Sequence, residues 1–202
     1  MPLGAFKAAL MGTAGVSTAD VVLLSSQTAS NSASITFTGL MTSTYGEYIF
    51  KFYNINPATD GVHFSFQVNA TDGADYNDSA ITSSFFRAVQ EQDANPAELA
   101  YITNSDLAQS ASFQMLTPSG TTGNGSDESL AGELHIFNPA STTYVKHFYA
   151  RTSSYYSNHP TVEGIMDSFA GGYINDTTAI DDIQFKINSG NFDGTIKMWG
   201  VK

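Results

Sequence analysis

The segment 180-IDDIQFKINSGNFDGTIKMWGVK-202 sets the expected fold, because two alternating runs stand on either side of a turn. Apolar or small residues recur at every second position of both runs: Ile183, Phe185 and Ile187 in the first, and Ile196, Met198 and Gly200 in the second. A period of two is the pattern of a β-strand with one buried face. Ser189-Gly190-Asn191 supplies turn residues between the runs, so the sequence predicts a terminal hairpin. We expect the last strand to lie inside a sheet, with a neighbour on each side.

The same alternation occurs in the first half of the chain. In 62-VHFSFQVN-69 the apolar residues face one way, as in a half-buried strand of an antiparallel sheet. These residues are Val62, Phe64, Phe66 and Val68. In 47-EYIFKFYNI-55 aromatic residues occupy both faces, so we expect the outer face of this strand to be covered as well. The turn residues 56-NPATDG-61 join the two segments and predict a second hairpin.

Three further clear strands follow the same pattern: 34-SITFTGL-40, 132-GELHIFNP-139 with Leu134 and Ile136 on one face, and 143-TYVKHFYARTSSYY-156. The middle of the chain is less clear. Asn95-Pro96 before residues 97–100 favours a helical turn or two. The sum of at least eight short strands indicates an all-β fold, an antiparallel β-sandwich of the jelly-roll type. We expect an extended N-terminal arm over residues 1–30 and the sandwich domain over residues 31–202.

The composition excludes several classes of protein. The 202 residues include no cysteine, which excludes disulfide frameworks, thiolate zinc sites and cysteine nucleophiles. The chain has 8 Lys and Arg against 19 Asp and Glu, a net charge of -11. Nucleic acid is therefore not an expected partner, because binding its phosphates requires Lys and Arg. No apolar run approaches the ~20 residues of a membrane helix. The N-terminal stretch does not fit a signal peptide, since Lys7 lies inside its apolar run and Gly12 interrupts that run.

Motifs that carry catalysis are absent from the sequence. It has no G-x-S-x-G elbow, phosphate loop, dinucleotide fingerprint or H-E-x-x-H pair. Glycosidases use two carboxylates, and only Glu47 and Glu133 lie in expected strands, so a glycan-cleaving enzyme is the third hypothesis. His63 and His135 would hold a metal only if they shared a sheet face. The acidic loop 72–78 departs from the spacing of a calcium-binding EF-hand and favours an Asx-type turn. We expect no catalytic residue, no metal and no cofactor.

Aromatic residues crowd the segment 144–156. Three of them are expected to fill the sandwich core: Tyr144, Phe148 and Tyr149. The residues at the end of the segment fit a core position and an exposed loop equally well. In a loop, such tyrosines would stack on sugar rings or anchor a partner protein. The candidate glycan-binding residues are therefore Tyr155, Tyr156, Asn158 and His159.

Three segments resemble structural proteins of tailed bacteriophages: residues 45–69, 132–139 and 179–202. In that group a Tyr/Phe-rich strand leads into an N-I-x-P turn, here at residues 54–57, and a short G-E-hydrophobic strand ends in Asn-Pro. The chain closes on I-x-F-x-x-x-S-G-N-x-x-G-T-I-K-hydrophobic-aromatic-G, here with Trp199 where Tyr is usual. The resemblance implies a jelly-roll virion protein without catalysis that works within an assembly. Gly194 and Gly200 would stand where a side chain does not fit.

The first functional hypothesis is a homo-oligomeric, trimeric decoration or cement protein on the surface of a phage capsid. Its partners would be copies of itself and the phage major capsid protein or tail proteins. Apolar residues of the N-terminal arm would hold a neighbour or the shell: Leu3, Phe6, Leu10 and Met11. The second hypothesis is a tail-fibre or tail-tip adsorption protein that binds host glycan. The three-fold symmetry is implied by the resemblance alone.

Overall fold

The structure, a computed structural model, describes residues 20–92, 97–159 and 162–202, with the backbone alone at 156–159 and 162. These residues form twelve β-strands, and none of them belongs to a helix that could cross a membrane. The strands are β1 (Val21–Ser32), β2 (Ser34–Phe37), β3 (Glu47–Pro57), β4 (Phe64–Ala70), β5 (Ile81–Glu91), β6 (Glu98–Tyr101), β7 (Gln114–Met115), β8 (Leu130–Phe137), β9 (Lys146–His159), β10 (Val162–Ile174), β11 (Ile180–Ile187) and β12 (Phe192–Val201).

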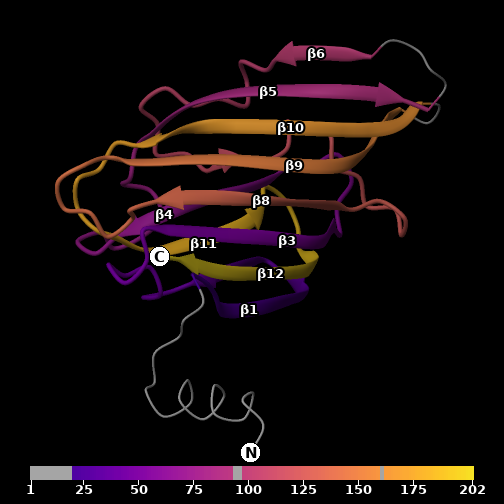
Figure 1. Cartoon of the computed structure of the whole chain (residues 1–202). Coiled ribbons are helices and arrows are strands. Elements are labelled where there is room, and N and C mark those ends of the chain that lie inside the picture. Colours follow the sequence, from indigo (N-terminus) through magenta and orange to yellow (C-terminus); the bar gives the residue numbers. More distant parts are fainter. Residues whose placement is uncertain (1–19, 93–96, 160–161) are drawn as a thin grey trace, which may run out of the picture.

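Two antiparallel sheets pack face to face as a sandwich (Figure 1). The eight-stranded sheet has the order β1-β12-β3-β8-β9-β10-β5-β6 and runs from the bottom to the top of Figure 1. The four-stranded sheet, of order β2-β11-β4-β7, lies behind it. The expected all-β antiparallel sandwich is therefore confirmed, whereas the jelly-roll type stays a prediction.

Phe185 on β11 lies at the centre of the core between the sheets. Its ring centroid is 5.3 Å from those of Phe50 and Phe52 on β3 in the opposite sheet. On the neighbouring strand β4 it is 5.9 Å from Phe64 and 6.4 Å from Phe66. The predicted inward-facing residues are buried in every one of these strands: Phe64, Phe66 and Val68; Leu134 and Ile136; Ile183, Phe185 and Ile187; Ile196 and Met198. Alternation therefore identified the buried faces correctly.

Neither expected hairpin forms. β3 belongs to the eight-stranded sheet and β4 to the four-stranded sheet, so residues 58–63 carry the chain from one layer to the other. Ser189-Gly190-Asn191 likewise connects β11 to β12 across the sandwich, with Gly190 at a φ of 81°. The hairpin predictions were wrong because alternation indicates which face of a strand is buried, not which strand lies beside it. β12 does lie inside a sheet, between β1 and β3, as predicted.

Gly194 and Gly200 stand where a side chain does not fit, as the resemblance implied. At Gly194 φ is 136°, and a Cβ would lie 2.7 Å from Ile55 Cδ1 and 2.8 Å from the carbonyl oxygen of Asn54. At Gly200 a Cβ would lie 2.6 Å from the ring of Tyr45. Both glycines therefore allow a close approach of β12 to its surroundings.

β4 is covered on both faces, although the sequence predicted a half-buried strand. Ser65 and Gln67, which alternate with the core phenylalanines, are 1% and 0% exposed. Gln67 Nε2 donates hydrogen bonds to the carbonyl oxygens of Ala111 and Ser112, at 2.9 and 3.1 Å. The segment before β7 therefore closes over the outer side of β4 and satisfies its buried amide.

β3 shows the opposite difference, because its outer face is open. Tyr53 is 41% exposed, and Ile49 is partly exposed. Ile55, predicted to share their face, is fully buried. A register shift follows Phe52, and Asn54 has a φ of 51°, so the strand turns Ile55 inward. A bulge of this kind breaks the period of two on which the prediction depended.

Residues 98–101 form β6 rather than a helical turn. β6 pairs with β5 from Phe86↔Tyr101 to Val89↔Glu98. The edge of β5 offers backbone partners to this segment, and such tertiary pairing overrides a local helix signal.

The expected N-terminal arm over residues 1–30 falls only partly on the described chain. Residues 21–30 lie in β1, which pairs with β12. The arm residues Leu3, Phe6, Leu10 and Met11 lie outside the described residues, and their role stays a prediction.

Candidate docking face on the eight-stranded sheet

Exposed apolar side chains gather on one side of the sandwich. We call this side the outer face: the face of the eight-stranded sheet that points away from the four-stranded sheet. Ten large hydrophobic side chains are strongly exposed among the described residues, and eight of them lie on the outer face. The eight are Val21, Leu23, Tyr53, Phe86, Leu99, Tyr101, Tyr149 and Ile165. They are spread from β1 at one edge of this sheet to β6 at the other. Apolar side chains exposed together on one face are candidates for an interaction site.

Four rings form a stacked row across the centre of the outer face, which we call the aromatic row: His135, Tyr149, Phe169 and Phe86. The His135 and Tyr149 centroids are 4.4 Å apart with planes inclined by 15°. Tyr149 and Phe169 are 6.3 Å apart and nearly parallel, at 4°, and Phe169 and Phe86 are 4.9 Å apart at 21°. The row arises because β8, β9, β10 and β5 are neighbours at the spacing of a β-sheet. Rings that cover one another present mainly their edges to solvent.

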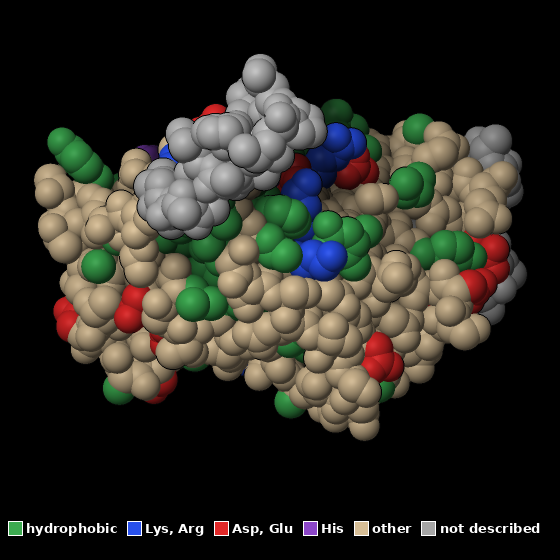
Figure 2. All heavy atoms as spheres, turned by 60° about the horizontal axis from the view of Figure 1, so that its bottom comes forward, with side chains coloured by type: hydrophobic (Ala, Val, Ile, Leu, Met, Phe, Trp, Pro, Cys, Tyr) green, Lys and Arg blue, Asp and Glu red, His purple; other side chains and the backbone are tan. Residues whose placement is uncertain are grey.

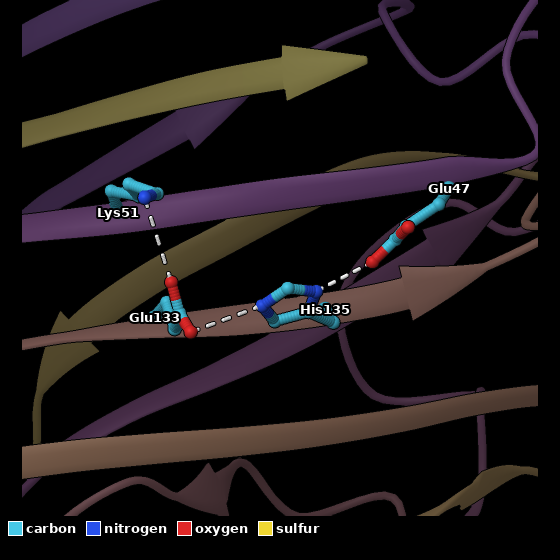
Figure 3. Close-up of polar contacts among 4 residues, drawn as sticks. All are labelled: Glu47, Lys51, Glu133 and His135. Atoms are coloured by element: carbon cyan, nitrogen blue, oxygen red, sulfur yellow. Dashed lines mark hydrogen bonds and ion pairs between the residues drawn. The ribbon is translucent and has the colours of Figure 1, made fainter. Parts of the chain in front are cut away.

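A chain of polar contacts, which we call the polar chain, runs beside the aromatic row, and Figure 3 shows His135 between two carboxylates. His135 Nδ1 is 2.5 Å from Glu47 Oε1, and its Nε2 is 3.3 Å from Glu133 Oε1. Glu133 also pairs with Lys51, at 3.7 Å. His135 is only 8% exposed. Glu47 and Glu133, the pair of acids singled out in the sequence, thus meet at one imidazole and hold its ring in the row.

Charged side chains of both signs lie paired on the outer face. Three of the eight Lys and Arg residues of the chain lie there: Lys51, Arg151 and Lys197. Arg151 donates two hydrogen bonds of 3.1 Å from Nε and one of 2.5 Å from Nη2 to the Asp167 carboxylate. These bonds to Asp167 raise the pKa of the Arg151 guanidinium. Lys197 Nζ lies over the Tyr53 ring, 5.2 Å from its centroid. Figure 2 shows Lys and Arg side chains among hydrophobic ones on this part of the surface.

An open groove crosses the outer face. One hollow of about 520 Å³ lies between Lys51 and Tyr53 on one side and Ile165 and Asp167 on the other. A second hollow of about 360 Å³ adjoins it and is lined by Tyr155. The two share three lining residues, Ala131, Ser153 and Ile165. These mostly small side chains form the floor that joins the two hollows.

The predicted glycan-binding residues lie in a strand and not in a loop. Tyr155, Tyr156, Asn158 and His159 all belong to β9, which pairs with β10 as far as His159↔Val162. Tyr155 lines the groove, where burial and the Glu163 carboxylate raise its pKa. The side chains of the other three residues lie outside the described part of the structure. The structure therefore places one of the four predicted residues at a hollow.

Two tyrosines expected in the core are exposed instead. Tyr144 is 73% exposed and Tyr149 is 37% exposed, whereas Phe148 is buried as predicted. Tyr149 alternates with Phe148 and Ala150, which both face inward. The alternation of 146-KHFYART-152 contained this signal, but the aromatic character of the segment outweighed it in the prediction.

The predicted metal candidates do not assemble. His63 precedes β4 of the four-stranded sheet and His135 lies on β8 of the other, so the two share no sheet face. In the acidic loop, the Asn77 N–H donates to Asp75 Oδ1 at 3.2 Å, which is the Asx-type turn that the sequence favoured. No group of three His, Cys, Asp or Glu side chains suited to a metal occurs in the part of the chain that the structure describes.

No protein-family model, curated protein or solved structure shows a significant match to this chain. The resemblance to phage structural proteins therefore depends on the segments in which it was recognised.

Proposed function

We propose that the chain is a non-enzymatic structural protein of a phage particle, a capsid decoration or cement protein that associates with copies of itself through the outer face. The observation that carries the association is that, of the ten strongly exposed large apolar side chains in the described part of the chain, eight lie on this one face. The location on a phage particle is supported by the resemblance of residues 45–69, 132–139 and 179–202.

Charge favours a second copy as the occupant of this face. Two chains of net charge -11 repel each other over most of their surfaces. On the outer face, however, the cations Lys51 and Lys197 lie on the same sheet as the carboxylates Glu47 and Glu133. Contact between two such faces places cations of one copy opposite carboxylates of the other, while the exposed ring edges are buried. Protein interfaces of about 800 Å² per partner suffice for a stable complex.

Sedimentation velocity of the full chain over a range of concentrations tests self-association. We expect an oligomer, with three copies as the resemblance implies, and dissociation on Ile165→Glu because a carboxylate then enters an apolar contact. Leu40→Glu is the matched control, since Leu40 is also exposed but lies off this face. A monomer at all concentrations, or equal effects of the two variants, would contradict association through the outer face.

The position on the particle is tested separately by counting copies of this chain against the major capsid protein in purified virions by quantitative mass spectrometry. A count comparable to that of the capsid protein is expected for a decoration or cement protein. A count of a few to a few tens would place the chain in the tail.

A tail-fibre or tail-tip protein that binds host glycan is the second candidate. The observation that favours it is the position of Tyr155 in a hollow beside Ile165. Binding of the purified chain to host cells, lost on Tyr155→Ala, together with a low copy number, would support this candidate over the first.

A further inference from the structure

A cavity of about 640 Å³ opens at the end of the sandwich where β8 ends and β9 begins, on the left in Figure 1. It lies between the connection that precedes β3 and the connection from β8 to β9. Its walls include Tyr45, Phe137, Asn138, Ser141, Tyr144 and His147. None of its lining residues is shared with the groove of the outer face. It is therefore a separate site, of the size at which ligand pockets are found.

Tyr144 stands at this cavity with its side chain 73% exposed. Its backbone is nevertheless held in place. Ser141 Oγ accepts hydrogen bonds from the N–H groups of Thr143 and Tyr144, at 3.2 and 3.1 Å, and the Ser141 N–H donates to the carbonyl oxygen of Asn138 at 3.0 Å. The backbone that carries this exposed ring is thus fixed, so binding of a ligand would order little additional main chain.

The other walls are also fixed. The Tyr45 ring packs edge-to-face on Tyr48, with centroids 5.8 Å apart at 82°, and it fills the space left by the missing side chain of Gly200. The Asn138 N–H donates to the carbonyl oxygen of Gly46 at 2.7 Å, which ties the two connections together. The cavity is thus formed before any ligand arrives.

The lining chemistry indicates what the cavity would bind. None of the residues that line it, all within the described chain, is Asp, Glu, Lys or Arg. An anion would find no cation there, and a purely apolar ligand would leave the amide of Asn138 and the hydroxyl of Ser141 unused. Exposed aromatic carbon beside neutral hydrogen-bonding groups suits a ligand with apolar C–H faces and many hydroxyls. Tyrosine combines an apolar ring with a polar tip at such wet sites.

We propose that this cavity is a binding site for a neutral saccharide, with one sugar ring against Tyr144 and sugar hydroxyls bonded to Asn138, Ser141 and His147. The site is distinct from the groove that contains Tyr155. It borders the aromatic row, since the ring centroids of Phe137 and Tyr149 are 5.8 Å apart, but it needs no second copy of the chain to complete it.

Affinity electrophoresis of the full chain tests the site, because the net charge of -11 drives the protein through a native gel. The gels contain dextran, glycogen, galactomannan or hydroxyethyl cellulose as neutral polysaccharides, and alginate as an acidic comparison. We expect retardation by at least one neutral polymer and none by alginate. Tyr144→Ala should weaken binding at least tenfold, whereas Tyr144→Phe, which keeps the ring, should retain it.

Tyr53→Ala and Tyr155→Ala are matched controls, since each removes one tyrosine from the groove of the outer face. Neither is expected to change the retardation, and the melting temperature of every variant verifies its fold. Migration unaffected by all four neutral polymers would overturn the proposal. So would retardation that survives Tyr144→Ala, and loss of retardation with Tyr155→Ala alone would assign saccharide binding to the groove.

Discussion

Tyr149 lies flat against His135, with ring centroids 4.4 Å apart, while the same imidazole contacts Glu47 and Glu133 through its two nitrogens. The two residues are paired directly across β8 and β9. A polar chain and an aromatic row thus meet at a single histidine on the surface of the sheet. Whatever binds the outer face meets an ordered array of ring edges and charges.

Removal of the Tyr149 ring should therefore weaken the aromatic row. Stacked aromatic pairs contribute about 0.5–1.5 kcal/mol beyond burial of area, and Tyr149 stacks on both His135 and Phe169. We expect Tyr149→Ala to lower the free energy of unfolding by about 1–3 kcal/mol in urea titrations. Tyr149→Phe keeps the ring and should stay close to the wild type. Equal losses in both variants would assign the effect to the hydroxyl group instead.

Removal of a buried ring from the core should lower the free energy of unfolding more than removal of a ring from the surface. Phe66 is 0% exposed and contacts Phe148 and Phe185, with centroids at 5.3 and 6.4 Å. We expect Phe66→Ala to lower the free energy of unfolding by about 3–5 kcal/mol. Tyr53→Ala, at an exposed position, serves as the control. A loss below about 1 kcal/mol for Phe66→Ala would mean that the side chain does not fill the core.

The phenol of Tyr76 should lose its proton at a higher pH than an ordinary tyrosine. Burial and the nearby Asp182 and Asp181 carboxylates raise its pKa to about 12, against a hydrogen bond with Thr36 that lowers it. Between pH 10 and about 12 the folded chain keeps a proton that the unfolded chain loses. The free energy of unfolding should therefore fall as the pH rises through this interval.

Urea unfolding of the wild type and of Tyr76→Phe at a series of alkaline pH values measures this dependence. The variant should show the shallower decline, since it has no phenol to ionise. Parallel pH profiles would contradict a raised pKa of the partly buried Tyr76, as would a tyrosinate absorbance titration in which every tyrosine ionises near pH 10.

His63 should make the fold sensitive to mild acid. Burial lowers its pKa below the ordinary value of 6.5. The unfolded chain therefore takes up a proton at a pH where the folded chain does not, so stability is complete above pH 6.5 and falls as the pH drops. His63→Gln should flatten the thermal melting profile between neutral and mildly acidic pH. His147→Gln is the control. A profile unchanged by His63→Gln would show that another group causes the acid sensitivity.

The sequence by itself determined the class of fold and most of the buried faces. Alternation placed Phe185, Leu134 and Ile196 in the core, and their burial is complete. A period of two is a local property of the chain, so it can be read without knowledge of the partner strands. The lack of room beside Gly200 was likewise implied by the terminal motif.

Only the tertiary structure decided which strands are neighbours, and with them the candidate sites. β3 and β4 look like a hairpin locally, yet they belong to opposite sheets. The aromatic row exists because β9 and β10 join β8 to β5 in one sheet. His135 and Phe86, which are distant in sequence, thereby become the two ends of one row of rings. Tyr144 is exposed on a turn whose backbone is tied to Asn138 and Ser141. Strand pairing depends on contacts between distant segments, and a local pattern of side chains does not specify them.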